Sequence, residues 1–251
     1  MNLNLQDRSV FVTGGSGGIG RAIVLAYAAE GARVTLTYLS DEKSASSLVK
    51  DVETAGGVAA AVPMDLTDNS SIERAVGAAA SRHGGLDVLV ANAVRWPTDA
   101  MSSLVESDRD MWQNALRANL EGTAATVRAA WPLLVQSGHG RIVLISTGVT
   151  RHGMPGATAY AAAKAGLEGL MAALKWEGGQ SILTNVVAPG FTVTEDNLAR
   201  FPDEVREEVR KRTPSGRLSV PEDVAPAVVF LGSPANTNIT GCYLRVAGGT
   251  D

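Results

Sequence analysis

Short runs of apolar and β-branched residues alternate, along almost the whole chain, with longer stretches whose apolar positions recur at helical spacing. The short runs are apolar on successive positions, which is typical of strands buried on both faces of a parallel sheet. Strands that alternate with helices indicate βαβ units, with helices covering both faces of the sheet. The sequence therefore predicts an α/β fold with strands at residues 9–13, 33–38, 58–64, 86–92, 141–146, 183–188 and 242–247.

The pattern gives no sign of a domain boundary. No linker, internal repeat or low-complexity segment interrupts it, so a single domain over residues 1–251 is expected. Residues 191–213 differ from the rest because they are highly charged, are interrupted by Pro202 and precede the last helix and strand. Two interpretations stay open for this insertion: a substrate flap over a cleft, or a solvent-exposed helix.

Composition excludes several classes of protein. The 251-residue chain is 45% hydrophobic, and its net charge of −4, with both signs interspersed, offers no basic surface for nucleic acid. The N-terminus lacks the basic and apolar segments of a signal peptide, and no apolar run reaches the ~18 residues of a membrane span. The single cysteine, Cys242, excludes an internal disulfide and is expected as a small buried residue in a late strand. We expect a cytoplasmic protein with no membrane or nucleic-acid partner and no metal site.

A cluster of glycines, TGGSGGIG at residues 13–20, follows the first predicted strand and opens the first helix. Its spacing, Gly14-x-x-x-Gly18-x-Gly20, differs from the common G-x-G-x-x-G motif, but the physical requirements are the same. Gly14 permits a tight turn, Gly18 lets a pyrophosphate approach the backbone, and Gly20 lets the helix pack closely on the strand. The helix N-terminus offers N–H groups and a partial positive charge to an anion.

Tyr160 and Lys164 lie four residues apart in the strongly helical stretch AYAAAKAGLEGL. This spacing places the phenol and the ammonium group on one face of a helix. A nearby cation lowers the pKa of tyrosine from about 10, so that the phenol can exchange a proton with a carbonyl or alcohol near neutral pH. The alternative is a surface Tyr–Lys pair without a function.

Together, TGGSGGIG, Asn92 in LVANA, YAAAK and PGFTVT (189–194) resemble the short-chain dehydrogenase/reductase family in their order and approximate spacing. The segments GRIVLIS, NVVAPGF and RLSVPEDVA look most like the 3-oxoacyl-carrier-protein reductase branch and its polyketide ketoreductase relatives. The resemblance implies a seven-stranded Rossmann sheet and hydride transfer between a nicotinamide and a ketone or secondary alcohol. Residues 14–20, Asp65, Asn92, Thr147 and Pro189 each follow a predicted strand, so they are expected in one crevice at the carboxyl edge of the sheet.

The resemblance also implies residue roles. Tyr160 would be the general acid or base, Lys164 would bind the nicotinamide ribose, and Asn119 would kink its helix and bind a water in a proton relay. Asp65 would contact the adenine amino group, while Thr192 and Thr194 would face the carboxamide and phosphates. The full set of implied cofactor contacts is Gly14, Ser16, Gly17, Gly18, Ile19, Gly20, Tyr38, Ser40, Asp65, Leu66, Asn92, Ala93, Tyr160, Lys164, Pro189, Gly190, Thr192 and Thr194.

The chain departs from the family pattern at three places. The substrate-orienting serine of the family aligns with Thr147, and Ser146 lies one position earlier; Thr147 is favoured, with Ser146 as the alternative. Val94 replaces a glycine, so this loop cannot adopt positive φ without strain. The stretch KWEGGQSI (175–182) is shorter than the corresponding segment of relatives.

The end of the second strand decides the choice of cofactor. NAD-preferring relatives carry an acidic residue there, whereas this chain has Tyr38, followed by Ser40 and Lys43, which could receive a 2′-phosphate. Gly17 stands where many NADPH users carry an arginine. NADPH is favoured, with NADH as the alternative.

Two hypotheses follow for function. The first is a ketoreductase acting on a 3-oxoacyl thioester or polyketide carbonyl, free or on a carrier protein, or in reverse on a small secondary alcohol. The second is a family member with weakened or lost catalysis that serves as a non-catalytic partner or regulator. Thr147 and Val94 motivate the second, whereas Tyr160, Lys164 and Asn119 argue against it.

The resemblance also implies self-association, as a homotetramer or dimer that pairs through residues 221–247. Side chains expected to flank the substrate pocket are Arg95, Trp96, His152, Met154 and Phe191.

Overall fold

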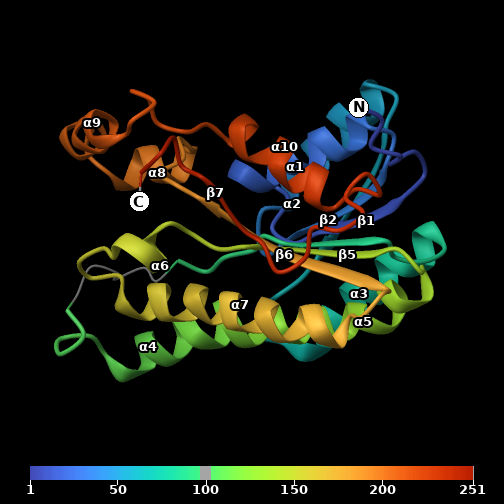
Figure 1. The fold of residues 1–251 in the computed structure, drawn as a ribbon, viewed down its shortest axis with the longest axis horizontal. Helices are drawn as coiled ribbons and strands as arrows, with labels where there is room; N and C mark the ends of the chain where they lie inside the picture. The colour runs from blue at the N-terminus through green and yellow to red at the C-terminus, as the bar shows by residue number, and fades with distance from the viewer. Residues whose placement is uncertain (97–102, 251) are drawn as a thin grey trace.

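The computed structural model describes residues 1–96 and 103–250 (Figure 1). Seven parallel strands form one sheet in the order β3-β2-β1-β4-β5-β6-β7, which confirms the predicted fold class. The strands all lie within two residues of the predicted runs: β1 (Ser9–Val12), β2 (Arg33–Tyr38), β3 (Val58–Pro63), β4 (Val88–Ala91), β5 (Gly140–Ile145), β6 (Ile182–Pro189) and β7 (Tyr243–Val246).

Helices cover both faces of the sheet (Figure 1). Because successive side chains of a strand point to opposite faces, Val10 and Val12 of β1 join one core, whereas Phe11 joins the other. The helices over the first core are α1 (Gly18–Ala29), α2 (Glu42–Thr54) and α10 (Pro221–Leu231). Those over the second are α3 (Asn69–His83), α5 (Gly122–Gln136) and α7 (Thr158–Glu177), and α4 (Arg109–Leu116) packs against α7.

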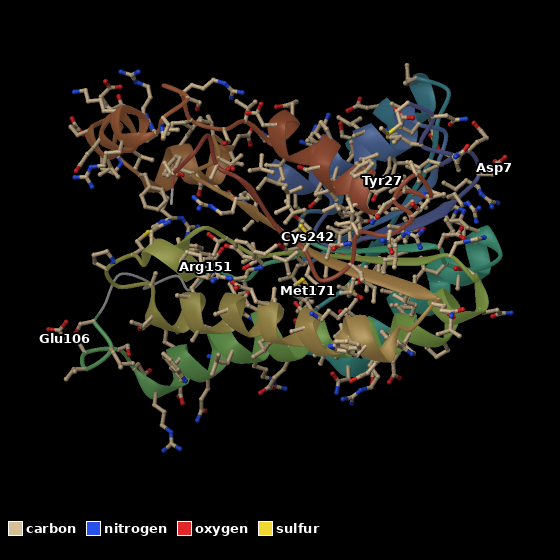
Figure 2. The ribbon with its side chains drawn as sticks, viewed as in Figure 1. Asp7, Tyr27, Glu106, Arg151, Met171 and Cys242 are labelled. Atoms are coloured by element: carbon tan, nitrogen blue, oxygen red, sulfur yellow. The ribbon has the colours of Figure 1, made fainter. Side chains whose placement is uncertain are left out.

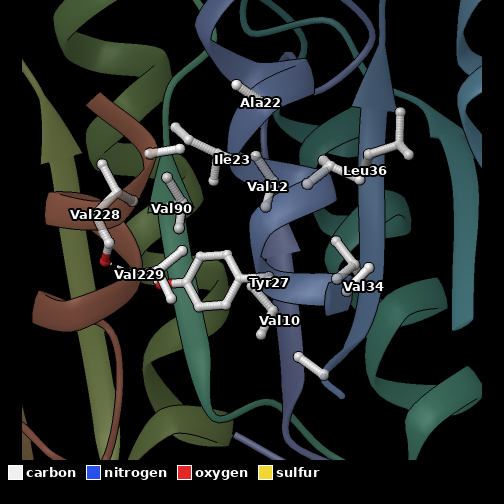
Figure 3. Close-up of a cluster of buried hydrophobic side chains, with 14 of the residues drawn as sticks. Val10, Val12, Ala22, Ile23, Tyr27, Val34, Leu36, Val90, Val228 and Val229 are labelled. Atoms are coloured by element: carbon white, nitrogen blue, oxygen red, sulfur yellow. Dashed lines mark hydrogen bonds between the residues drawn. The ribbon is translucent and has the colours of Figure 1, made fainter. Parts of the chain in front are cut away.

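Tyr27 of α1 lies at the centre of the first core, between Val10 and Val229 (Figure 3). Its ring is fully buried, and its hydroxyl donates to the carbonyl oxygen of Val228 at 3.1 Å. Burying an aromatic ring whose polar atom is satisfied stabilises the core without an orphaned donor. This hydrogen bond joins α10 to α1, although the two helices are far apart in the sequence.

The order of the strands reverses at β1. The chain passes from β1 through α1 to β2 on one side, and later from β3 through α3 to β4 on the other side of β1. Open α/β sheets bind ligands outside the carboxyl ends of the strands at such a reversal. The loops after β1, β4, β5 and β6 meet at this edge.

The charged insertion at 191–213 forms two helices, α8 (Glu195–Arg200) and α9 (Asp203–Arg212), which are separated at Phe201 and Pro202. Every residue of both helices is exposed or half-buried. A parallel bridge between Thr192 and Ser219 closes the base of the insertion. Together with the short helix α6 (Val149–His152), the two helices gather at one end of the molecule (Figure 1).

Several local predictions can be compared directly with the structure. Asp68 caps α3 by accepting from the Ser70 N–H at 2.9 Å, and Pro221 occupies the first turn of α10. Cys242 is only half-buried and immediately precedes β7, so its expected place inside a buried strand was wrong. Within the described residues, no helix is long and apolar enough to cross a membrane.

Gly77→Ala in α3 should raise the free energy of unfolding by about 0.5–1 kcal/mol, because glycine is a poor helix former. The added Cβ would meet no atom within 4 Å. At Gly122, the first residue of α5, a Cβ would overlap the Leu66 carbonyl oxygen, so Gly122→Ala should destabilise by about 1–3 kcal/mol. Urea unfolding measures the free energy of unfolding of both variants. An equal change of this free energy in the two variants would contradict the packing assigned to Gly122.

Candidate active site

The glycine cluster forms a tight turn between β1 and α1. Gly14 and Gly18 have φ values of +61° and +50°, which L side chains rarely adopt. A Cβ on Gly14 would lie 2.8 Å from the Cα of Ala93, so the turn also packs tightly on the loop after β4. The predicted need for glycine at these positions agrees with this geometry.

Asn92 fixes the same turn from the end of β4. Its Nδ2 donates to the carbonyl oxygens of Thr13 at 3.0 Å and Gly14 at 2.9 Å. In return, the Thr13 hydroxyl accepts from the backbone N–H groups of Asn92 at 3.0 Å and Ala93 at 2.9 Å. Sequence reasoning missed the role of Thr13, whose place directly before the glycines was its only signal.

The N-terminus of α1 is open to an anion. Gly17 is its N-cap, no side chain in the described part of the protein caps it, and its first turn contains no acidic residue. Gly17 and Gly18 are exposed, whereas Ser16 and Ile19 are half-buried. Because the first N–H groups of a helix lack partners inside the helix, this end can hold the phosphates of a dinucleotide.

Tyr160 and Lys164 both lie on the buried side of α7. Lys164 is 2% exposed, and its Nζ donates to the carbonyl oxygen of Ile145 at 2.9 Å. Burial raises the pKa of Tyr160 to about 12, against the smaller lowering effects of a hydrogen bond with Thr147 and the charge of Arg200. The expected lowering by Lys164 was therefore wrong for this state of the protein, because burial dominates and the ammonium group is bound to a carbonyl instead.

The structure separates the two candidate hydroxyls after β5. The Ser146 side chain is buried and donates to the carbonyl oxygen of Lys164 at 3.2 Å, whereas Thr147 hydrogen-bonds Tyr160. The carbonyl oxygen of Thr147 accepts from Tyr243 of β7 at 3.1 Å and from Thr150 at 3.0 Å. Of the two, Thr147 lies beside the phenol, and Tyr243 is a neighbour that no motif in the sequence marks.

Asn119 lies in a π-helical segment, η1 (Arg117–Glu121), between α4 and α5, so the helix is irregular where a kink was expected. Its side chain is fully buried and clamps the backbone of Arg95, accepting from the N–H at 2.9 Å and donating to the carbonyl oxygen at 2.8 Å. It also donates to the carbonyl oxygen of Ala115 at 3.0 Å. Asn119 thus fixes the loop that carries Trp96.

Trp96 covers the phenol ring of Tyr160. Their ring centroids are 4.4 Å apart, and the guanidinium carbon of Arg200 lies 4.8 Å from the Trp96 ring centroid.

The other pocket candidates lie around this stack or at the surface. The rings of Phe191 and Phe201 pack edge to face, with their centroids 5.3 Å apart. Of the other pocket candidates, Arg95 and His152 are exposed and Met154 is half-buried. Arg151 lies at the same end of the molecule (Figure 2), bound to Glu168 at 2.5 Å and stacked 4.7 Å from the Tyr243 ring centroid.

The loop after β4 does not need the missing glycine. Among the described residues, the non-glycine residues with positive φ are Asn4 and Asp7, so Val94 is not strained. Val94 is 50% exposed. A valine at position 94 is therefore compatible with the backbone of this loop.

The residues expected to hold the adenosine lie along the ends of β2 and β3. Thr67 holds the Asp65 carboxylate through N–H and hydroxyl hydrogen bonds of 2.8 and 2.7 Å, which lower the pKa of Asp65. Burial and Glu42 raise the pKa of Tyr38. Asp41 caps α2 through the Ser44 N–H at 2.9 Å, whereas Ser40 and Lys43 are exposed.

The segment after β6 is well ordered by its own hydrogen bonds. Pro189 ends β6, and the Gly190 N–H donates to the Val246 carbonyl oxygen at 2.9 Å. The Thr192 hydroxyl is directed to the carbonyl oxygen of Gly190 at 3.1 Å, and Thr194 caps α8 through the Asn197 N–H at 3.2 Å. Thr194 also reaches the glycine turn, since a Cβ on Gly18 would lie 3.3 Å from its methyl group.

Lys164 gives the protein without cofactor a specific pH dependence. Burial lowers the pKa of Lys164 to about 8 from an unfolded value of 10.5. Between these values the unfolded chain binds more protons at this position, so the free energy of unfolding should rise as pH increases from about 8 to 10. Urea unfolding across this range should show the rise in the wild type and a much smaller rise in Lys164→Met. An equal rise in both proteins would contradict the buried, cofactor-free state of Lys164.

The chain is similar to many known oxidoreductases. The family model described as enoyl-(acyl carrier protein) reductase matches residues 14–251. The chain is 34% identical to 3-oxoacyl-[acyl-carrier-protein] reductase FabG of Thermotoga maritima, over 98% of this chain and 99% of the relative. It is 37% identical to L-rhamnose 1-dehydrogenase (NAD(P)(+)) of a Sphingomonas species, over 98% of this chain and 96% of the relative.

Solved structures agree with this similarity. A short-chain dehydrogenase/reductase from Serratia marcescens is 33% identical, with a TM-score of 0.91 over 98% of both chains. A short chain dehydrogenase from Burkholderia cenocepacia, solved in complex with NADP, is 34% identical, with a TM-score of 0.90 over 98% of both chains.

Proposed function

The chain belongs to the short-chain dehydrogenase/reductase family, and on that premise we propose that it is an NADPH-dependent ketoreductase. It is an oxidoreductase that moves a hydride between a nicotinamide and a ketone or secondary alcohol. The observation that carries the proposal is the hydrogen-bonded pair of Tyr160 and Thr147, which lies at the carboxyl edge of the sheet beside buried Lys164.

NADP(H) fits the residues at this edge. The Gly14–Gly20 turn leaves no room for side chains at three of its positions, Gly14, Gly15 and Gly20, and the open α1 N-terminus suits a pyrophosphate. Exposed Ser40 and Lys43 suit a 2′-phosphate, while the Asp41 carboxylate is already engaged as a helix cap. When bound, the cofactor supplies the hydride, and the protein supplies orientation and proton transfer.

Tyr160 acts as the acid in the direction of reduction. Its pKa of about 12 keeps the phenol protonated at neutral pH, so it can donate to a carbonyl oxygen that develops negative charge. Thr147 aligns the phenol and offers a second hydroxyl to the same oxygen. Asn119 holds the Arg95–Trp96 loop against the reacting group. Lys164 would hold the nicotinamide ribose, and its positive charge would stabilise the phenolate that Tyr160 becomes when it gives up its proton.

The substrate is a carbonyl compound of the 3-oxoacyl thioester or polyketide type, including one carried by a carrier protein, as the FabG relative suggests. The sugar dehydrogenase among the relatives is as similar to this chain as the FabG relative is, so overall identity alone does not select the substrate.

We propose that α8 and α9 form the substrate flap within a single catalytic domain of residues 1–251. Arg200 at the end of α8 supports this role, because it lies over Trp96 beside Tyr160.

Self-association into a homotetramer or dimer and a cytoplasmic location complete the proposal. β7 is the last strand of the sheet, and one of its edges is not paired within the described chain, so another copy could cover it. The single cysteine suits a reducing compartment.

The test is a fluorescence titration with NADPH and NADH, followed by absorbance at the nicotinamide band with 3-oxoacyl thioesters and simple ketones. We expect tighter binding of NADPH and turnover of at least one carbonyl. Binding without turnover would favour the alternative of a cofactor-binding protein that has lost catalysis and acts as a partner or regulator. Failure to bind either nucleotide would overturn the assigned glycine turn.

A further inference from the structure

Arg200 lies close to the reacting group although it is far from it in the sequence. It is the last residue of α8, and its guanidinium carbon lies 4.8 Å from the ring centroid of Trp96. Trp96 in turn contacts the ring of Tyr160 at 4.4 Å. Trp96 thus lies between the guanidinium group and the phenol along this stack. The positive charge of Arg200 lowers the pKa of Tyr160, against the larger raising effect of burial.

The charge of Arg200 is unmatched in the described residues. Its side chain is exposed, and no carboxylate of residues 1–96 or 103–250 pairs with it within 4 Å. The arginines of α9 behave differently, since Arg206, Arg210 and Arg212 each pair with an acidic residue of the same helix. A stacked guanidinium keeps its N–H groups in the plane, where they can bind a carboxylate through two parallel hydrogen bonds.

We propose that Arg200 binds a carboxylate of the substrate, so that the enzyme acts on short oxo acids as free anions in addition to the uncharged 3-oxoacyl chains of the proposed function. This inference rests on the proposed ketoreductase function. The substrate carbonyl must reach the hydroxyls of Tyr160 and Thr147, and a chain leading from it across Trp96 ends at Arg200. The span allows only a few bonds between the carbonyl and the carboxylate. A 3-oxoacyl thioester has no anion at that distance, because the phosphate of its carrier arm lies many bonds away.

The neighbouring residues are consistent with recognition of a small anion. Asn119 clamps the backbone of Arg95 and so holds Trp96, the next residue, in place under the guanidinium group. The indole restricts the guanidinium to one orientation, which reduces the entropy lost on binding. Arg200 is thus a specificity-determining residue rather than part of the proton transfer.

The experiment compares pyruvate, acetoacetate and levulinate with their methyl esters, with NADPH present, in the wild type, Arg200→Gln and Arg200→Lys. Arg212→Gln is the matched control, because Arg212 is an exposed arginine of α9 that pairs with Glu208. For at least one chain length we expect the wild type to prefer the acid over its ester. Arg200→Gln should raise KM for that acid by about 10-fold, with a smaller effect on the ester and partial recovery in Arg200→Lys. The control should match the wild type.

A wild type that prefers the esters, or an Arg200→Gln variant that loses acid and ester turnover equally, would overturn the inference. If no carbonyl compound is reduced, the ketoreductase proposal fails, and the carboxylate site is then tested by binding alone. Calorimetry of the NADPH-loaded protein with levulinate and methyl levulinate should show binding of the acid that Arg200→Gln weakens by about 10-fold. Equal binding of acid and ester by the wild type would overturn the site independently of turnover.

Discussion

Tyr160→Phe should lower kcat for carbonyl reduction by about 10²- to 10⁴-fold, the range expected for loss of a positioned proton donor. The substitution removes only the hydroxyl that Thr147 contacts and keeps the ring that packs on Trp96. Affinity for NADPH should therefore change little. Continuous absorbance assays at the nicotinamide band measure kcat, and fluorescence titration measures the affinity for NADPH.

Tyr27→Phe is the control for this prediction. Tyr27 is also buried and also loses one hydrogen bond, to the Val228 carbonyl oxygen, but it lies in the core under α1 and α10. It should lower the free energy of unfolding by about 1 kcal/mol without lowering kcat. If Tyr160→Phe kept more than about a tenth of wild-type kcat, another group would have to supply the proton.

The reverse reaction, alcohol oxidation, requires Tyr160 as the phenolate. Because burial raises the pKa of Tyr160, the rate of alcohol oxidation should increase towards alkaline pH.

Gly20→Ala should weaken NADPH binding by about 100-fold or more and lower the thermal midpoint of unfolding. A Cβ at this position would overlap the Gly14 carbonyl oxygen and lie 2.7 Å from the Nδ2 of Asn92. The turn must open to accept it, which breaks the two hydrogen bonds that Asn92 donates. The α1 N-terminus is then no longer held against β4. Fluorescence titration with NADPH measures the loss.

Gly169→Ala is the matched control, because Gly169 is an exposed glycine of α7 whose Cβ would meet nothing within 4 Å. It should bind NADPH as the wild type does and be slightly more stable. Wild-type affinity in Gly20→Ala would contradict the assignment of the turn as the cofactor cradle.

The sheet could be predicted from the sequence because parallel strands buried on both faces leave continuous apolar runs. β2, for example, occupies the predicted residues 33–38, and β4 differs only by shorter ends. The placement of Gly14, Asn92 and Thr147 at the carboxyl edge followed from the same runs, since each lies one or two residues past the end of a strand. These features depend on local pattern and on the order of elements.

The surroundings of Tyr160 could not be predicted in the same way. Helical spacing identifies Lys164 as a neighbour, but it says nothing of the Ile145 carbonyl that holds the ammonium group or of the indole that buries the phenol. Arg200 comes from a helix in the charged insertion and meets Trp96 only through the tertiary fold. The side chains that set the environment of the reacting group are thus distant in sequence, and no local pattern marks them.

The hydrogen bond from Tyr243 to the Thr147 carbonyl oxygen has a consequence for the order in which the molecule matures during synthesis. The two residues are 96 positions apart, and β7 follows every other strand along the chain. Domains generally fold as units, so Thr147 cannot be anchored until β7 has left the ribosome tunnel. A ribosome-bound chain that lacks residues 243–251 should therefore leave two groups at this edge unanchored, because Gly190 donates to Val246 and Thr147 accepts from Tyr243.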